Sequence, residues 1–210
     1  MQNWLYLYKT PGYNKLNFEL GGFIYGKNLA NGSLVDERCY PELQEMLDDC
    51  RAEGLSPVIC SAYRSRERQQ DLFQQKVTDY LNIGYSDFQA EFEAAQVVAR
   101  PGYSEHQLGL AMDIVDLNNQ ILDESQEQTA VQQWLMEHSW EYGFIMRYPP
   151  DKSEFTGIIY EPWHYRYVGR EAAQIIYEQN FCLEEFITLL KNNVWLTKRS
   201  ALFKRLLLAN

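Results

Sequence analysis

Short apolar runs of strand length, set between longer segments of helical periodicity, constrain the fold of this chain most. Segment 41–51 carries apolar residues at i, i+3, i+4 and i+7, which is the spacing of one helical face. Run 57–63 is short, apolar and contains β-branched residues, so we expect a strand there. Ser65 stands where it can cap a following helix, and Ser86 with Gln89 forms the capping-box pattern of another. The first half of the chain therefore predicts helices around one strand.

The second half of the chain adds further helices and more short strands. A helix is predicted over 129–142, closed by Gly143, and two more over 171–180 and 183–191. The predicted strands are short apolar segments bounded by polar residues: 111–117, 144–147, 158–161 and 163–168. Helices that precede and follow a group of strands close in sequence are typical of an α+β fold. We therefore expect a small, mainly antiparallel sheet flanked by helices.

A single domain accounts for the length and composition of the chain. Its 210 residues, 46% of them hydrophobic, are enough to bury one core, and no repeat or Gly/Ser-rich linker marks a boundary. Within this domain we expect an N-terminal arm over about 1–35, a central core over about 36–170 and C-terminal helices over about 171–210. The apolar segment 200–210 is expected to pack on the same domain, with packing on a partner as the alternative.

Charge and cysteine content limit the expected partners and compartment. The formal net charge of −10 provides no basic surface for phosphates, so nucleic acid is not an expected partner. No stretch approaches the roughly 20 apolar residues of a membrane-spanning helix, and no leader segment is visible at the N-terminus. The four cysteines, at 39, 50, 60 and 182, have no CxxC spacing. We interpret them as buried free thiols, with a disulfide pair as the alternative, and free thiols favour a reducing compartment.

Two of the three histidines, His106 and His164, lie in aperiodic segments rich in polar and aromatic residues. Asp113 lies between them in an apolar, strand-like run, where an ionised carboxylate is costly unless a cation meets it. An ion pair with an arginine, or a turn cap, is the alternative for this aspartate. Two imidazoles and one carboxylate are a usual ligand set for a catalytic zinc ion with one position left open. The three residues therefore predict a Zn²⁺ site.

Glu161 and Arg64 are the candidate catalytic groups beside that site. Glu161 precedes His164 by three residues, and an unbroken strand would point the two side chains to opposite faces. Pro162 bends the chain, so we expect both side chains to converge, with Glu161 acting on the attacking water rather than binding the metal. Arg64 follows the first predicted strand and is placed to hold an oxyanion, although a plain salt bridge explains its position equally well. His138 shares a helical stripe with apolar residues, which predicts packing.

Three motifs give this chain a resemblance to a known family. The zinc D,D-peptidases are marked by S/D-x-Y-R, S-x-H-x-x-G-x-A-x-D and E-x-W-H. This sequence resembles them in SAYRSRERQ (61–69), SEHQLGLAMD (104–113) and EPWHYRYVG (161–169). The family includes the VanX, VanY and VanXY peptidases of vancomycin resistance. Segment 144–169 is also similar to the corresponding stretch of VanY and VanXY members.

The resemblance implies an activity and assigns roles to the motif residues. It implies that Zn²⁺ is bound by His106, Asp113 and His164. Glu161 would be the general base, and Arg64 would stabilise the carbonyl oxygen. Substrate contacts would come from four other motif residues: Ser61, Gln69, Ser104 and Trp163. The implied reaction removes a terminal D-alanine from the D-Ala-D-Ala dipeptide or from peptidoglycan-precursor peptides that end in it.

Two other functions stay open at the level of the sequence. An endopeptidase that cuts L-Ala-D-Glu bonds would need the same metal chemistry, and a catalytically silent peptidoglycan-binding module could keep the same fold. Many VanY-type members carry an N-terminal anchor that is not visible here, so the chain looks more like the soluble VanXY members. This implies a cytoplasmic location, or an extracytoplasmic one if an anchor has been removed. The first motif reads Ser-Ala where Ser-Gly or Asp-Gly is frequent, which leaves the choice between dipeptide and pentapeptide open.

Overall fold

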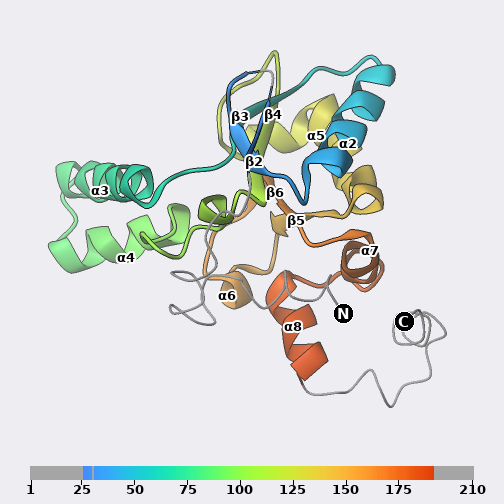
Figure 1. The fold of residues 1–210 in the computed structure, drawn as a ribbon. Coiled ribbons are helices and arrows are strands. Elements are labelled where there is room, and N and C mark those ends of the chain that lie inside the picture. The colour runs from blue at the N-terminus through green and yellow to red at the C-terminus, as the bar shows by residue number, and fades with distance from the viewer. Residues whose placement is uncertain (1–25, 30, 192–210) are drawn as a thin grey trace.

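A four-stranded antiparallel sheet lies at the centre of the computed structural model, which describes residues 26–29 and 31–191 (Figure 1). Its strands, in their order across the sheet, are β3 (Pro57–Ser61), β4 (Ala111–Asp116), β6 (Glu161–Tyr167) and β5 (Phe144–Tyr148). A separate two-stranded sheet pairs β1 (Gly26–Asn28) with β2 (Leu34–Asp36). The α+β fold with a small antiparallel sheet is therefore confirmed.

Helices cover both faces of the central sheet. They are α2 (Tyr40–Ala52), α5 (Ala130–His138), α7 (Arg170–Glu178) and α8 (Leu183–Lys191). Because side chains alternate along a strand, Phe144 and Ile145 of β5 belong to two different apolar clusters. Phe144 packs in the cluster formed with α2 and α5, whereas Ile145 packs with α7 and α8. The sheet is thus a central layer between two pairs of helices (Figure 1).

α3 (Arg66–Asn82) and α4 (Asp87–Val97) form a hairpin that extends away from the sheet (Figure 1). As predicted, the Ser65 side chain caps α3, and Ser86 with Gln89 forms the capping box of α4. The two helices share a small apolar cluster of their own, formed by Phe73, Val77, Ala90 and Ala94. The hairpin therefore has an apolar cluster of its own, and Phe88 and Phe92 of α4 remain exposed.

Short helical turns complete the described part of the chain: η2 (Glu105–Leu108), η3 (Glu124–Gln128), η4 (Ser139–Tyr142) and α6 (Ser153–Thr156). The helix predicted over 129–142 is α5 followed by η4. Gly143 ends it at a φ of 83°, a left-handed conformation that favours glycine. The predicted helices near 171–180 and 183–191 correspond to α7 and α8.

The prediction of two separate strands over 158–161 and 163–168 is wrong. A single strand, β6, begins at Glu161 and runs through Pro162. Along β6, Glu161 pairs with Tyr148 and Tyr165 pairs with Met146, so the ladder is irregular between these pairs. Pro162 lies at this irregularity, where no ladder donor is needed. Segment 158–160 is not a strand, because its Ile159 amide donates to the Gln96 carbonyl of α4 instead.

All four cysteines are free thiols, but one of them is not buried. Cys39, Cys50 and Cys182 are buried as predicted, whereas Cys60 is exposed. Cys60 lies at a register shift in β3, an edge strand, and because side chains alternate along a strand it points to the face opposite that of the buried Ile59. The prediction of burial is therefore wrong for this residue.

None of the helices within residues 26–29 and 31–191 is both long and apolar enough to cross a membrane. The division into an arm (1–35), a core (36–170) and C-terminal helices (171–210) stays a prediction. Segment 200–210, predicted to pack on the domain, lies outside the described residues, as does most of the arm.

Candidate metal centre

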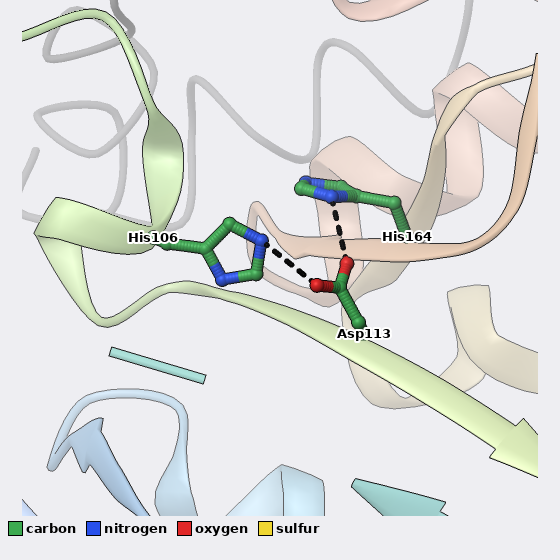
Figure 2. Close-up of side chains that lie close together, drawn as sticks. All are labelled: His106, Asp113 and His164. Carbon is green, nitrogen blue, oxygen red and sulfur yellow. Dashed lines mark ion pairs between the residues drawn. The ribbon is translucent and has the colours of Figure 1, made fainter. Parts of the chain in front are cut away.

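His106, Asp113 and His164 come together from three different elements (Figure 2). His106 lies in η2, Asp113 in β4 and His164 in β6, and one ligand atom from each lies within 4.8 Å of the others. Asp113 and His164 are direct partners across the β4–β6 ladder, so the sheet itself holds two of the three side chains together. Gly109, in a left-handed conformation with a φ of 67°, turns the chain between η2 and β4 and brings His106 close to this strand. The structure therefore assembles the predicted trio.

The carboxylate of Asp113 lies between the two imidazoles (Figure 2). Its Oδ2 is 3.4 Å from Nε2 of His106, and its Oδ1 is 3.1 Å from Nδ1 of His164. All three side chains are buried, and within the described part of the chain neither His106 Nε2 nor Asp113 Oδ1 has a well-directed hydrogen bond. Buried polar atoms without partners are costly, and a cation among them would satisfy them. These residues therefore fit a metal ion.

A backbone contact sets the orientation of His106. Its Nδ1 lies 2.7 Å from the carbonyl oxygen of Ala62, and because a carbonyl only accepts, Nδ1 carries the hydrogen. Nε2 is then left with its lone pair on the side of Asp113, as a metal ligand requires. Burial lowers the pKa of His106 to about 4, so the imidazole is neutral near pH 7. A neutral imidazole is the form that binds metals.

Arg64 adds a fixed cation at the edge of this cluster. Its Nη2 lies 3.4 Å from Oδ2 of Asp113, and its Nη1 donates to Oε1 of Gln69 at 3.1 Å. Burial by itself raises the pKa of Asp113, but His106 and His164 hold that pKa well below its usual range. The ion pair with an arginine, which the sequence left open as the alternative to a metal at Asp113, is thus present together with the contacts to the two imidazoles. Arg64 lies close enough to act on a group bound beside them.

Glu161 lies beside the trio without belonging to it. Its Oε2 is 3.6 Å from Nδ1 of His164, and the side chain is buried. The irregular ladder at Pro162 breaks the two-residue alternation of β6, which brings Glu161 and His164 to the same site as predicted. Burial, and then the negative charge of Asp113, raise the pKa of Glu161 well above its usual range.

The predicted substrate residues lie around this centre in different ways. Ser104 is buried immediately before η2, and Trp163 is buried in β6. Ser61 is partly exposed at the end of β3, opposite Asp113 in the ladder. Gln69 is buried and uses both ends of its amide within the protein, since its Nε2 donates to the carbonyl of Ala99 at 2.7 Å. Gln69 therefore holds Arg64 in place.

His138 is outside the cluster, as predicted. Its ring contacts Trp134 at a centroid distance of 4.9 Å, and its Nδ1 lies 2.9 Å from Oε1 of Glu141. The His138 side chain is 36% exposed, so it is only partly packed against the domain. Both contacts are local to α5 and η4.

Several residues next to the two imidazoles were not singled out from the sequence. Tyr148 contacts the ring of His164 at a centroid distance of 4.9 Å. Arg147 donates from Nε to Glu105 Oε1 at 2.8 Å, and Nη1 of Arg166 lies 3.1 Å from the same oxygen. Burial raises the pKa of Glu105, but Arg147 and Arg166 outweigh it and hold the pKa at about 2. This ion network ties the segment before His106 to β5 and β6, and the only sequence signal was the place of Glu105 within the second motif.

The fold and these side chains define a class of protein. It is an α+β protein in which two strands of the sheet and the turn η2 bring together two histidines and one aspartate suited to a single metal ion, with a buried glutamate beside them. Residues 32–170 match the family model described as VanY: D-alanyl-D-alanine carboxypeptidase. The chain therefore belongs to the VanY D-alanyl-D-alanine carboxypeptidase family.

Known relatives agree with this placement. The chain is 49% identical over 161 residues to a D-alanyl-D-alanine carboxypeptidase of Enterococcus faecalis (strain ATCC 700802 / V583), covering 77% of this chain and 58% of the relative. It is similar to VanYB in complex with D-Alanine-D-Alanine, with a TM-score of 0.73 and 47% identity over 79% of this chain and 88% of that one. A mutant of the vancomycin-resistance D,D-pentapeptidase VanY, solved in complex with Zn(II), matches with a TM-score of 0.71 and 47% identity, covering 78% and 89%. The chain thus spans 58% of the length of the curated relative.

Proposed function

We propose that this protein is a zinc-dependent D,D-carboxypeptidase, which removes the terminal D-alanine from peptidoglycan-precursor peptides ending in D-Ala-D-Ala. The observation that carries the proposal is the buried trio His106, Asp113 and His164 with the Glu161 carboxylate 3.6 Å from one of its imidazoles. Family membership and the relatives solved with Zn(II) and with D-Alanine-D-Alanine support it. A catalytically silent module would have no use for a buried glutamate at this place.

Zinc suits the ligand atoms that the trio offers. His106 would bind through Nε2 and His164 through Nδ1, with the Asp113 carboxylate between them. Two neutral imidazoles and one carboxylate leave the site with a net positive charge when zinc is present. The bound ion would lower the pKa of a water molecule and polarise the scissile carbonyl.

The protein side chains then carry out the proton transfers. Glu161 takes a proton from the attacking water as the water oxygen bonds to the carbonyl carbon. It returns that proton to the nitrogen of the leaving D-alanine as the C–N bond breaks. Arg64, held by Gln69 and Asp113, donates hydrogen bonds to the oxygen that becomes negatively charged. Ser61, Ser104 and Trp163 are proposed to line the substrate site.

The reaction can be tested directly by mass spectrometry. The zinc-loaded protein is incubated with three substrates: D-Ala-D-Ala, a muramyl pentapeptide ending in D-Ala-D-Ala, and an L-Ala-D-Glu peptide. We expect release of D-alanine from one or both of the first two and no cleavage of the third. Cleavage of the L-Ala-D-Glu bond alone would identify an endopeptidase, and absence of any product would indicate a binding module.

The role of Arg64 predicts a selective loss of turnover. Changing Arg64 to methionine removes the donors that face the developing oxyanion, so we expect kcat to fall by about 10²-fold. The zinc content of the protein, measured without substrate, should stay unchanged, because Arg64 is not a metal ligand. Arg68→Met is the matched control, since Arg68 is exposed on the first turn of α3. Equal activity of the two variants would show that Arg64 only forms a salt bridge.

We propose a cytoplasmic location from the state of the cysteines. All four are free thiols, which suits a reducing, cytoplasmic environment. An extracytoplasmic location is the alternative, because members of this family with an N-terminal anchor act there. Fractionation of cells that express the native gene would decide between the two locations.

A further inference from the structure

A buried ion network lies next to the two histidines of the trio. Arg147 of β5 donates from Nε to Oε1 of Glu105 at 2.8 Å, and from Nη1 to Oε2 of Glu184 in α8 at 3.0 Å. Nη1 of Arg166 in β6 lies 3.1 Å from the same Glu105 oxygen. Arg147, Arg166 and Glu105 are all buried. Replacing buried ion pairs by apolar groups is often neutral or stabilising, so the stability of the fold does not by itself explain this network.

On one side, the network holds the turn that carries His106. Glu105 immediately precedes His106 in η2, so the contacts of two arginines with its carboxylate limit how far this histidine can move. Other contacts hold His106 from the opposite direction. Its Nδ1 lies 2.7 Å from the carbonyl oxygen of Ala62, and its own carbonyl accepts from the Arg64 amide at 3.2 Å. His106 is thus attached to the segment after β3 by its own atoms, and to β5 and β6 through Glu105.

On the other side, the network reaches His164 by two routes. Arg166 lies two residues further along the same strand, β6. Arg147 reaches His164 through a ring: its Cζ lies 4.8 Å from the centroid of Tyr148, which is 4.9 Å from the centroid of the His164 imidazole. Tyr148 is buried, so its ring has little freedom to turn away. Arg147 therefore contacts both the residue that precedes His106 and the ring that packs on His164.

The ladder of the sheet does not set the relative place of the two imidazoles. Asp113 and His164 are partners in the β4–β6 ladder, whereas His106 lies in η2, outside it. The two imidazole rings meet edge to face, with their centroids 4.9 Å apart. The ligand atoms of a metal site have to be held to within about 0.5 Å of their geometry, and the groups around them supply this restraint. The trio therefore needs a restraint that joins η2 to the strand that carries His164.

Arg147 is placed to supply that restraint. Building on the proposed function, we infer that Arg147 is a positioning residue of the metal centre, which sets the place of the His106 imidazole relative to that of His164. It acts through Glu105 on the first imidazole and through Tyr148 on the second. A planar guanidinium suits this role, because it donates to two carboxylates in fixed directions and presents a face to the ring. The ammonium group of a lysine is a single point of charge and cannot hold all of these contacts.

Changing Arg147 to lysine keeps the charge and removes the fork of donors. We expect the affinity for zinc, measured by competition with a chelator, to fall by roughly tenfold. The visible absorption bands of the Co²⁺-loaded protein should also shift, because they depend on the arrangement of the ligand atoms around the ion. Arg170→Lys is the matched control. Arg170 is likewise paired with a glutamate, Glu45, and lies over a tyrosine ring, but it stands at the start of α7, and both readouts should stay as in the native protein.

A second control separates loss of stability from loss of positioning. Ile187→Ala removes a buried side chain from the apolar cluster of α7 and α8, which lowers the free energy of unfolding and leaves every charged group of the network unchanged. Urea unfolding of the metal-free proteins measures that loss for each variant. We expect Ile187→Ala to keep the native zinc affinity and the native cobalt spectrum.

If Arg147→Lys does not fold, Glu105→Asp takes its place. This change keeps the charge and shortens the side chain by one methylene group, so η2 has to move or lose its contacts with the arginines, and we expect the same two changes. Native zinc affinity and an unchanged cobalt spectrum in the folded variant would show that Arg147 does not position the imidazoles, as would equal changes in Ile187→Ala.

These measurements also keep the role of Arg147 apart from the proposed function. Both readouts record metal binding, so the role of Arg147 is decided even if the native protein binds zinc and cleaves no peptide, in which case the proposed function alone fails. A native protein that binds neither zinc nor cobalt would overturn both.

Discussion

Replacing Glu161 with glutamine should leave the protein folded and loaded with zinc but reduce hydrolysis of D-Ala-D-Ala peptides by roughly 10³-fold. Glutamine has nearly the same shape as glutamate, so the packing of this buried side chain against β5 is preserved. Its amide cannot take a proton from water or return one to the leaving amine. The ligand atoms of His106, Asp113 and His164 are unchanged, so metal binding has no reason to weaken.

This variant is measured by two independent readouts. Steady-state release of D-alanine gives kcat, and elemental analysis after dialysis gives the zinc content. Glu154→Gln is the matched control, because it makes the same chemical change on an exposed residue of α6. Turnover close to that of the native protein in Glu161→Gln would refute the assignment of the general base. Loss of zinc together with activity would instead make Glu161 a ligand.

Removing either imidazole of the trio should release the metal. In His106→Ala and His164→Ala, two ligands remain where three are proposed, and each change also leaves a buried space beside the Asp113 carboxylate. We expect zinc affinity to fall by far more than the roughly 10–100-fold that is typical of changes to groups around the ligands. Activity should be lost in parallel, because the charge that polarises the carbonyl is gone.

Zinc content per chain, determined after dialysis against metal-free buffer, checks this prediction. His138→Ala is the control within the same protein, since His138 lies outside the trio and contacts Trp134, Glu137 and Glu141 of α5 and η4. Full occupancy in either His106→Ala or His164→Ala would show that the trio is not the ligand set. Far-ultraviolet circular dichroism of each variant separates loss of metal from loss of fold.

The local part of the structure follows from the sequence. Helix ends at Ser65 and Ser86 were predicted because a cap depends on a few neighbouring residues, and the structure has both caps. Asp113 was a candidate ligand because a carboxylate in an apolar run has to meet a positive charge. The candidate centre itself came from His106 and His164, the two histidines that had no place in a periodic pattern.

Other features depend on contacts between segments far apart in the chain. The extent of β6 and the convergence of Glu161 with His164 depend on the register of strand pairing, and the exposure of Cys60 depends on the place of β3 at the edge of the sheet. The ion network around Glu105 joins η2 to β5 and β6 in the same way. Register is set by how whole strands pack and pair, so no window of neighbouring residues contains it. The sequence by itself determined which residues are suited to hold a metal, and only the tertiary structure decided that they meet.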